Sequence, residues 1–231
     1  LEVAADMVRL ADALVEVDVC GAPLSTGDFL ADNLVTIANS SKPAFLVSGD
    51  SAAVMKGVIE MAKVIRGSVE ALREKPYFAT IVSPEVLLYP ETVIDHIRLT
   101  VDCGAPIFMA SMPIGGISSP VTIAGTLTVC LSTTLAGIVL AQLLKKGHPC
   151  VDSSFPTFMD PATASIGGIP ENAMADAARA KICGKLGLPV SQQTGFACFT
   201  KDRPQDAVAE MTWDLAKLTD RRFASYWGAG T

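Results

Sequence analysis

The chain has 231 residues and a mass of 24.2 kDa, which is enough for one large domain or two small ones. Half of the residues are hydrophobic and only 18% are charged, so the chain can bury enough apolar surface to fold, which excludes intrinsic disorder. The net charge of −6 argues against a nucleic-acid-binding protein, because such proteins need clustered lysine and arginine.

The first half of the chain alternates between two sequence patterns. Apolar residues at helical spacing predict helices, and short apolar runs rich in valine predict strands. Ser51 is the expected N-cap of the third helix, because its hydroxyl can accept a hydrogen bond from the first turn. In chain order we expect a helix over 4–15, a strand over 16–21, a helix over 28–40, a strand over 43–48, a helix over 51–66, a strand over 77–82 and a helix over 91–101.

The second half continues the alternation and contains a long segment without charge. We expect a strand over 106–111, a loop over 112–116, and a helix that begins at Pro120 and ends at Lys145, Lys146 and Gly147. Beyond it we expect a strand over 150–154, a helix over 170–186, a strand over 189–192, a helix over 205–218 and a strand over 222–227.

Strands that alternate with helices indicate an α/β protein with a parallel sheet and right-handed crossovers. Because no G-x-G-x-x-G fingerprint is present, the repeated unit favours a TIM-type (β/α) barrel with about seven βα units in this chain. We therefore interpret residues 1–231 as a single, partial barrel domain. An open doubly wound sheet is the alternative.

The uncharged segment between Asp102 and Lys145 raises the question of a membrane, because residues 121–144 are long enough to span a bilayer. The segment contains several serines and threonines, and neither end carries the tryptophan or tyrosine that marks a membrane interface. The chain also begins with an acidic stretch rather than a secretory signal. We expect a cytoplasmic protein, with a membrane-embedded helix bundle as an alternative.

The cysteines and histidines do not predict a metal site. The six cysteines are widely spaced and form no CxxC pair, which fits reduced, buried thiols. His148 and Cys150 have the spacing of some zinc sites, but a tetrahedral site needs further ligands, so we expect no metal. His96 falls within a helix and His148 precedes a strand, so we expect surface or loop histidines without an acid–base role.

Chemistry in a parallel barrel lies at the carboxyl ends of the strands. There the sequence supplies carboxylates and aromatic rings, which together suit an organic cation such as a quaternary ammonium. We select Asp50, Phe155, Asp160 and Trp227 as candidate substrate-binding residues. For the aromatic rings the alternative role is core packing, and for Asp50 it is an N-cap.

The residues that follow the fourth expected strand resemble a known family. Residues 112–127, MPIGGISSPVTIAGTL, are similar to the signature of the trimethylamine:corrinoid methyltransferase family. Further stretches resemble the family in the same order, namely residues 38–43, 83–84 with 87–88, 153–156 with 159–160, and 227–230. The family's chains are about twice as long, so the resemblance indicates a central piece of the barrel.

The resemblance implies a TIM-type barrel that moves a methyl group from a methylated amine to the Co(I) of a separate corrinoid protein. The cobalamin would be carried by that partner, with no cofactor bound directly, and Gly115 and Gly116 would face the corrinoid at the rim. Trimethylamine members carry pyrrolysine, whereas residues 195–201 read GFACFTK. This implies the branch acting on quaternary amines such as glycine betaine, within one-carbon metabolism and methanogenesis.

Two questions remain open at this level. A small-cation or corrinoid-protein binding module without catalytic activity is the alternative function. The uncharged helix lacks the polar face of an outer barrel helix, so we expect missing flanks or another subunit to cover it, which favours a homo-oligomer.

Overall fold

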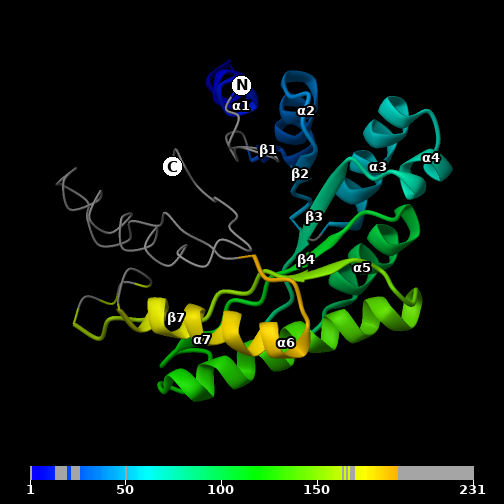
Figure 1. Cartoon of the computed structure of the whole chain (residues 1–231). Helices are drawn as coiled ribbons and strands as arrows, with labels where there is room; N and C mark the ends of the chain where they lie inside the picture. The colour runs from blue at the N-terminus through cyan, green and yellow to red at the C-terminus, as the bar shows by residue number, and fades with distance from the viewer. Residues whose placement is uncertain are drawn as a thin grey trace. The chain divides into compact units, whose positions relative to one another are not determined.

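The computed structural model describes residues 2–13, 20–21, 27–49, 51–162, 164, 166 and 170–191. These residues form an alternating series of helices and strands (Figure 1). The helices are α1 (Glu2–Ala13), α2 (Phe29–Asn39), α3 (Ala52–Arg66), α4 (Val69–Glu74), α5 (Glu91–Cys103), α6 (Ile123–Leu144) and α7 (Pro170–Leu186). The strands are β1 (Cys20–Gly21), β2 (Ala44–Leu46), β3 (Phe78–Val82), β4 (Ile107–Met109), β5 (Ile114–Gly115), β6 (Cys150–Asp152) and β7 (Thr157–Phe158).

The main sheet has the strand order β1-β2-β3-β4-β6, so neighbours follow the order of the chain. The pairs β1–β2 and β2–β3 are parallel, with Ala44 opposite Phe78 and Leu46 opposite Thr80. A parallel bridge between Asp152 and Val190 adds the next segment at the β6 edge. The predicted α/β class with a parallel sheet is therefore confirmed.

Capping groups mark the ends of several helices. Asp28 accepts hydrogen bonds from the backbone of Leu30 and Ala31, and Ser51 accepts one from Val54, as the sequence predicted for Ser51. Gly104 ends α5 in the left-handed conformation, with a φ of 82° that a residue with a side chain adopts only under strain. These caps fix where α2 and α3 begin and where α5 ends.

Two compact units make up the chain, one formed by residues 1–83, 89–108 and 139–150, the other by residues 84–88, 109–138 and 151–231. We call them the first and second unit. Our expectation of one domain over residues 1–231 stays a prediction.

In the first unit, alternate strand residues have separate roles. Ala44, Leu46 and Phe78 join one apolar cluster with the buried face of α3 and with side chains from α2, α4 and α5. The intervening Phe45 meets the ring of Phe108 edge to face, with centroids 5.1 Å apart. Because neighbouring strand residues point to opposite faces, the helices cover one face of these strands and the phenylalanine pair lies on the other.

In the second unit, parallel pairing extends beyond the ends of β4 and β6. The backbone N–H groups of Ser153, Phe155 and Thr157 donate to the carbonyls of Met109, Ser111 and Pro113. The pairing then continues as β5 against β7. Both segments are therefore extended from residue 109 to 115 and from 152 to 158, with side chains on alternating faces.

Helix α6 is the one helix among the described residues that is long and apolar enough to cross a membrane, and 44% of its most apolar window is buried. A core helix passes the same test, so this is weak evidence for a span. Four cysteines, at positions 103, 130, 150 and 183, are free and buried, which confirms the prediction for these thiols.

Candidate functional site

A buried histidine lies behind the carboxyl ends of β2 and β3 in the first unit. His96 of α5 has no exposed surface, and its Nε2 lies 3.1 Å from Ser48 Oγ and 3.3 Å from Thr80 Oγ1. His148 is also buried, with 3% of its surface exposed. The prediction of surface or loop histidines is therefore wrong for His96, which is a buried helix residue in contact with Ser48 after β2 and Thr80 of β3. His148 does lie in a loop, between α6 and β6, but it is buried there.

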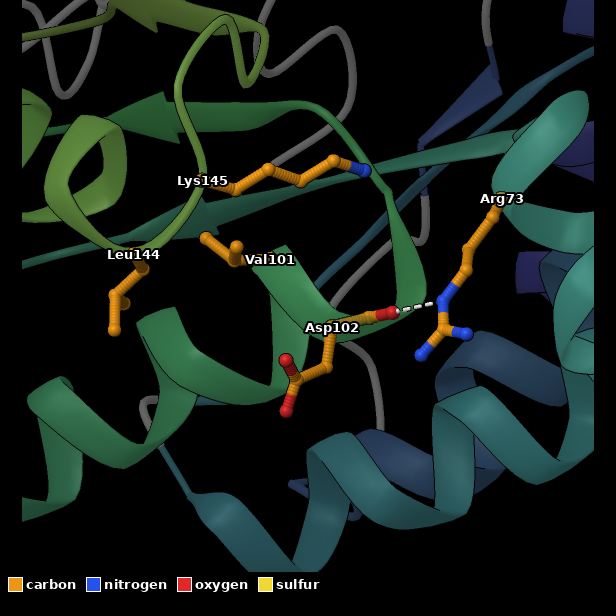
Figure 2. Close-up of a pocket in the computed structure, with 5 residues that line it drawn as sticks. All are labelled: Arg73, Val101, Asp102, Leu144 and Lys145. Atoms are coloured by element: carbon orange, nitrogen blue, oxygen red, sulfur yellow. Dashed lines mark hydrogen bonds between the residues drawn. The ribbon is translucent and has the colours of Figure 1, made fainter.

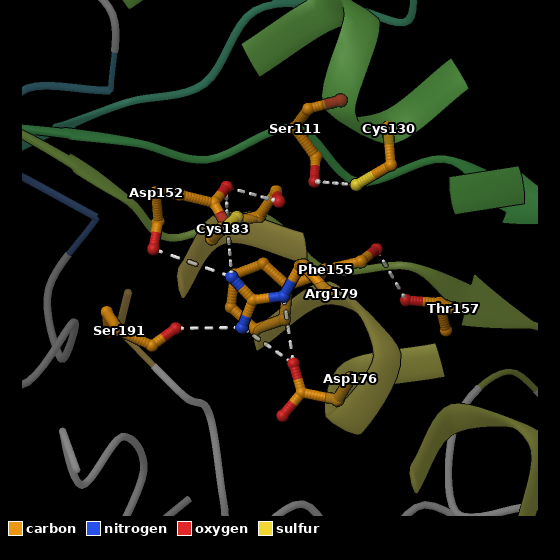
Figure 3. Close-up of polar contacts among 10 residues, drawn as sticks. Ser111, Cys130, Asp152, Phe155, Thr157, Asp176, Arg179, Cys183 and Ser191 are labelled. Atoms are coloured by element: carbon orange, nitrogen blue, oxygen red, sulfur yellow. Dashed lines mark hydrogen bonds and ion pairs between the residues drawn. The ribbon is translucent and has the colours of Figure 1, made fainter. Parts of the chain in front are cut away.

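An ion cluster lies at the carboxyl end of β6 in the second unit (Figure 3). Arg179 of α7 is fully buried and forms ion pairs with Asp152 and Asp176. Its guanidinium also donates to the carbonyls of Asp152 and Ser191, at 3.5 and 2.9 Å. These contacts use all five N–H groups of the side chain, so β6, α7 and the segment after Val190 are fixed to one another.

Burial and the charges of this cluster shift the pKa values of the groups in and around it. Burial alone would lower the pKa of Arg179, but Asp176 and Asp152 outweigh it and raise that pKa, so the guanidinium stays charged. Burial raises the pKa of the Cys130 and Cys183 thiols to about 12, and Asp152 adds to both shifts. Cys183 donates to Asp152 Oδ2 at 3.3 Å, so both thiols are protonated packing groups rather than nucleophiles.

The side chains at the end of β6 and just after it point alternately to two opposite faces of the extended segment. Asp152 and Ser154 share a hydrogen bond of 2.6 Å on the side of Arg179, and Phe158 packs against Leu127 of α6 and Ala175 of α7. Phe158 therefore belongs to the helix-facing core. By the alternation of an extended strand, Ser153 and Phe155 lie on the opposite face.

Residues 112–120, which carry the family-like signature, form a tight turn. The carbonyl of Ile114 accepts from the backbone N–H groups of residues 117, 118 and 119, and Ser118 Oγ accepts from the N–H of Ile114. Thr126 of α6 donates to the carbonyl of Pro120 at 2.7 Å. The turn is held by its own backbone and by the start of α6, so its shape is set without a ligand.

The two glycines of this turn have different surroundings. A Cβ on Gly115 would lie 2.4 Å from Phe158, so the absence of a side chain there permits close packing beneath β7. Gly116 is exposed and has a φ of 88°, and a Cβ added there would have its nearest neighbour 3.9 Å away. Of the two, Gly116 alone has open space on its outer side. A corrinoid-facing role for Gly115 and Gly116 stays a prediction.

Among the other candidates, Asp160 is half-buried and its Oδ1 accepts the N–H of Ala162 at 2.9 Å, so it also shapes a turn. Phe155 is half-buried on the face opposite the helices. Asp50 and Trp227 lie outside the described residues. The substrate-binding roles of Phe155 and Asp160 stay predictions.

Residues 38–43, another family-like stretch, form a junction in the first unit. The carboxylate of Asp12 accepts from Ser40 Oγ at 2.7 Å and from the N–H of Ser41 at 2.8 Å. These hydrogen bonds, led by that of Ser40, lower the pKa of Asp12. This motif joins the end of α1 to the end of α2.

Sequence reasoning missed Arg179, because a charged residue within a predicted helix is ordinarily exposed. A usable signal was Asp152, a charged residue within an otherwise apolar strand. A buried carboxylate there requires a cation, and the following helix carries the arginine that supplies it.

A separate pocket of about 340 Å³ lies in the first unit between Arg73, Val101, Asp102, Leu144 and Lys145 (Figure 2). Arg73 Nε donates to the carbonyl of Asp102 at 2.5 Å. These residues lie at or next to the carboxyl ends of α4, α5 and α6, and β4 and β6 begin shortly after α5 and α6. The pocket thus lies near the amino-terminal ends of β4 and β6.

The fold and site define a parallel α/β protein with a rigid turn and a buried ion cluster at the carboxyl ends of its strands. The model of the trimethylamine methyltransferase (MTTB) family matches residues 21–216, so the chain belongs to this family.

Curated relatives agree with this assignment. The chain is 31% identical to trimethylamine methyltransferase MttB of Desulfitobacterium hafniense, over 80% of this chain and 39% of that protein. It is 29% identical to a glycine betaine methyltransferase of the same species, over 81% of this chain and 40% of that protein. The MttB of Methanosarcina barkeri is 30% identical over 80% of this chain and 39% of its own length. The chain therefore spans about two fifths of the length of these relatives.

Proposed function

We propose that the full-length protein transfers a methyl group from a quaternary amine, such as a betaine, to the Co(I) of a separate corrinoid protein. The observation that carries this proposal is the family match over residues 21–216, with a glycine betaine methyltransferase among the relatives. The substrate branch is favoured by residues 195–201, which contain no pyrrolysine.

We further propose that the chain forms part of a TIM-type barrel. Two observations support this. The strands of the main sheet are neighbours in chain order, whereas a doubly wound sheet reverses its order at a switch point. In the first unit the helices α2 to α5 contribute to one apolar cluster on one face of the strands, as the outer ring of a barrel does.

The transfer breaks one C–N bond of the ammonium and forms a carbon–cobalt bond. The electron pair of the C–N bond stays on nitrogen, so the amine leaves neutral and needs no proton. The Co(I) centre of the partner supplies the two electrons of the new bond. This fits a site without an exposed histidine among the described residues, since His96 and His148 are both buried.

The chain's own residues would then bind, orient and exclude water. Phe155 presents an aromatic ring to the cation, and Asp50, Asp160 and Trp227 are the further candidates for this cage. The turn over residues 112–120 would form the rim that the corrinoid protein approaches, with Gly116 on its outer side.

The experiment combines full-length protein, reduced corrinoid protein and glycine betaine, and follows the loss of the Co(I) absorption. We expect conversion with at least one betaine, and a slower reaction for Phe155→Ala by about tenfold from the lost cation–π contact. Absence of conversion with every betaine tested would contradict the proposal. Betaine binding measured by calorimetry without any conversion would instead favour the binding module.

We also infer a homo-oligomer. The outer side of α6 exposes Val139 and Leu143 by 55% and 79%, and no charged residue lies on this helix. A second copy of the chain is the occupant we propose, and light scattering of the full-length protein tests it: a monomeric mass would contradict the inference.

A further inference from the structure

Ser153 is a buried hydroxyl that the ion cluster does not use. It follows β6 directly, its exposed surface is 0%, and its Oγ has no hydrogen-bond partner. Its backbone N–H is engaged with the carbonyl of Met109 in the parallel ladder. The backbone is therefore fixed, and the unpaired side chain is a property of this position rather than of a loose loop.

The direction of the hydroxyl follows from its neighbours along the strand. Asp152 and Ser154 are engaged on the helix side, through Arg179 and through their mutual hydrogen bond. Ser153 lies between them in an extended segment, so its side chain points to the other face. Phe155 lies two residues further along that same face, roughly 7 Å away by strand geometry.

A buried hydroxyl without a partner is unfavourable, because it has lost its bonds to water without replacing them. Such groups are uncommon in folded proteins and call for a ligand atom or an ordered water. A quaternary ammonium offers neither a donor nor an acceptor, so it cannot satisfy Ser153. An acceptor elsewhere on the same substrate can.

We propose that Ser153 donates a hydrogen bond to the carboxylate of a zwitterionic quaternary amine, whose ammonium group contacts Phe155. This rests on the proposed function and deepens it, since Ser153 becomes the residue that distinguishes betaines from quaternary cations without a carboxylate. A short zwitterion carries both charges within the reach of two residues on one strand face. The alternative occupant, an ordered water, is an outcome of the test.

The experiment measures calorimetric affinities of full-length protein for glycine betaine and for tetramethylammonium. Ser153→Ala is expected to lower the affinity for glycine betaine by about tenfold or more, because the lost hydrogen bond has a charged acceptor. Tetramethylammonium affinity is expected to change by less than about twofold, since that ligand has no acceptor. The control Ser132→Ala removes an exposed hydroxyl from α6 and is expected to change neither affinity.

The outcomes separate the two proposals. If the wild type binds both ligands and Ser153→Ala leaves the affinity for glycine betaine unchanged, Ser153 has no substrate role and holds a water, while the proposed function stands. If the wild type binds neither ligand and transfers no methyl group, both proposals fail. Thermal unfolding checks the fold of the variant. Should the alanine variant not fold, Ser153→Cys keeps the branching of the side chain with a larger and weaker donor, and is expected to lose betaine affinity in the same direction.

Discussion

The two units bury different chemistry behind their strands. In the first unit, α3 packs on β2 and β3 through apolar side chains such as Leu46, Met55 and Phe78. In the second unit, the space behind β6 holds Arg179 between two carboxylates. An apolar core tolerates small shifts of its elements, whereas a guanidinium with five occupied N–H groups permits one arrangement. The more rigid cluster lies behind the strand that carries Ser153 and Phe155.

The largest expected effect comes from Arg179→Met. The substitution leaves Asp152 and Asp176 without their cation, and breaking a buried pair in this way costs about 3–5 kcal/mol. Urea unfolding measures the loss. Lys181→Met on the exposed side of α7 is the matched control and is expected to change stability by less than about 0.5 kcal/mol. If Arg179→Met and Lys181→Met unfold with equal free energies, the ion cluster does not stabilise the second unit and the contrast with the apolar core of the first unit fails.

Leu46→Ala tests the apolar core of the first unit. Leu46 is fully buried, so we expect a loss of about 2–4 kcal/mol from lost transfer energy and the remaining cavity. The same unfolding experiment measures it, with the exposed Leu10→Ala as control. The loss should not depend on salt, and a strong salt dependence would contradict an apolar origin.

Gly115→Ala tests the packing beneath the signature turn. The added methyl group would lie 2.4 Å from Phe158, so we expect a loss of about 1–3 kcal/mol from overpacking. The control is Gly184→Ala in α7, where nothing lies within 4 Å of the new Cβ and alanine favours the helix. A destabilised control together with an unaffected Gly115 variant would reverse this assignment.

The smallest expected effect concerns pH in the first unit. Burial and the nearby charge of Lys145 lower the pKa of His148, so the folded state holds this imidazole neutral where the unfolded chain already binds a proton. Stability should therefore fall as the pH drops below the ordinary histidine value of about 6.5. Unfolding midpoints at pH 8 and pH 5 measure the decrease, which His148→Gln should reduce. If His148→Gln loses as much stability between pH 8 and pH 5 as the wild type does, the loss comes from other titratable groups.

Much of the fold could be predicted from the sequence, because periodicity and capping report local structure. The predicted bounds of α7 and the N-cap of α3 are confirmed, and the predicted strand over 77–82 became β3. Helix α4 and the short strands β5 and β7 were missed. These strands contain two residues each, and they are extended because the ladder continues from β4 and β6, which no local pattern records.

The site was predicted less completely, because it depends on contacts between distant residues. Strand ends pointed to Phe155, but not to Asp152 or to the ion cluster that this carboxylate forms with Arg179. The burial of His96 depends on Ser48 and Thr80, 48 and 16 residues away, and that of Arg179 depends on Asp152, 27 residues away, and helix periodicity does not reveal such partners. The predicted roles of Asp50 and Trp227 fall outside the described residues.

The central claim is methyl transfer from a quaternary amine, and the amine product tests it most directly. A single turnover of full-length protein with isotopically labelled glycine betaine and Co(I) corrinoid protein can be followed by nuclear magnetic resonance. The account predicts dimethylglycine in equal amount to the corrinoid that becomes methylated. If glycine betaine and the other betaines tested all stay unchanged, with no demethylated amine formed while the protein stays folded, the claim is contradicted.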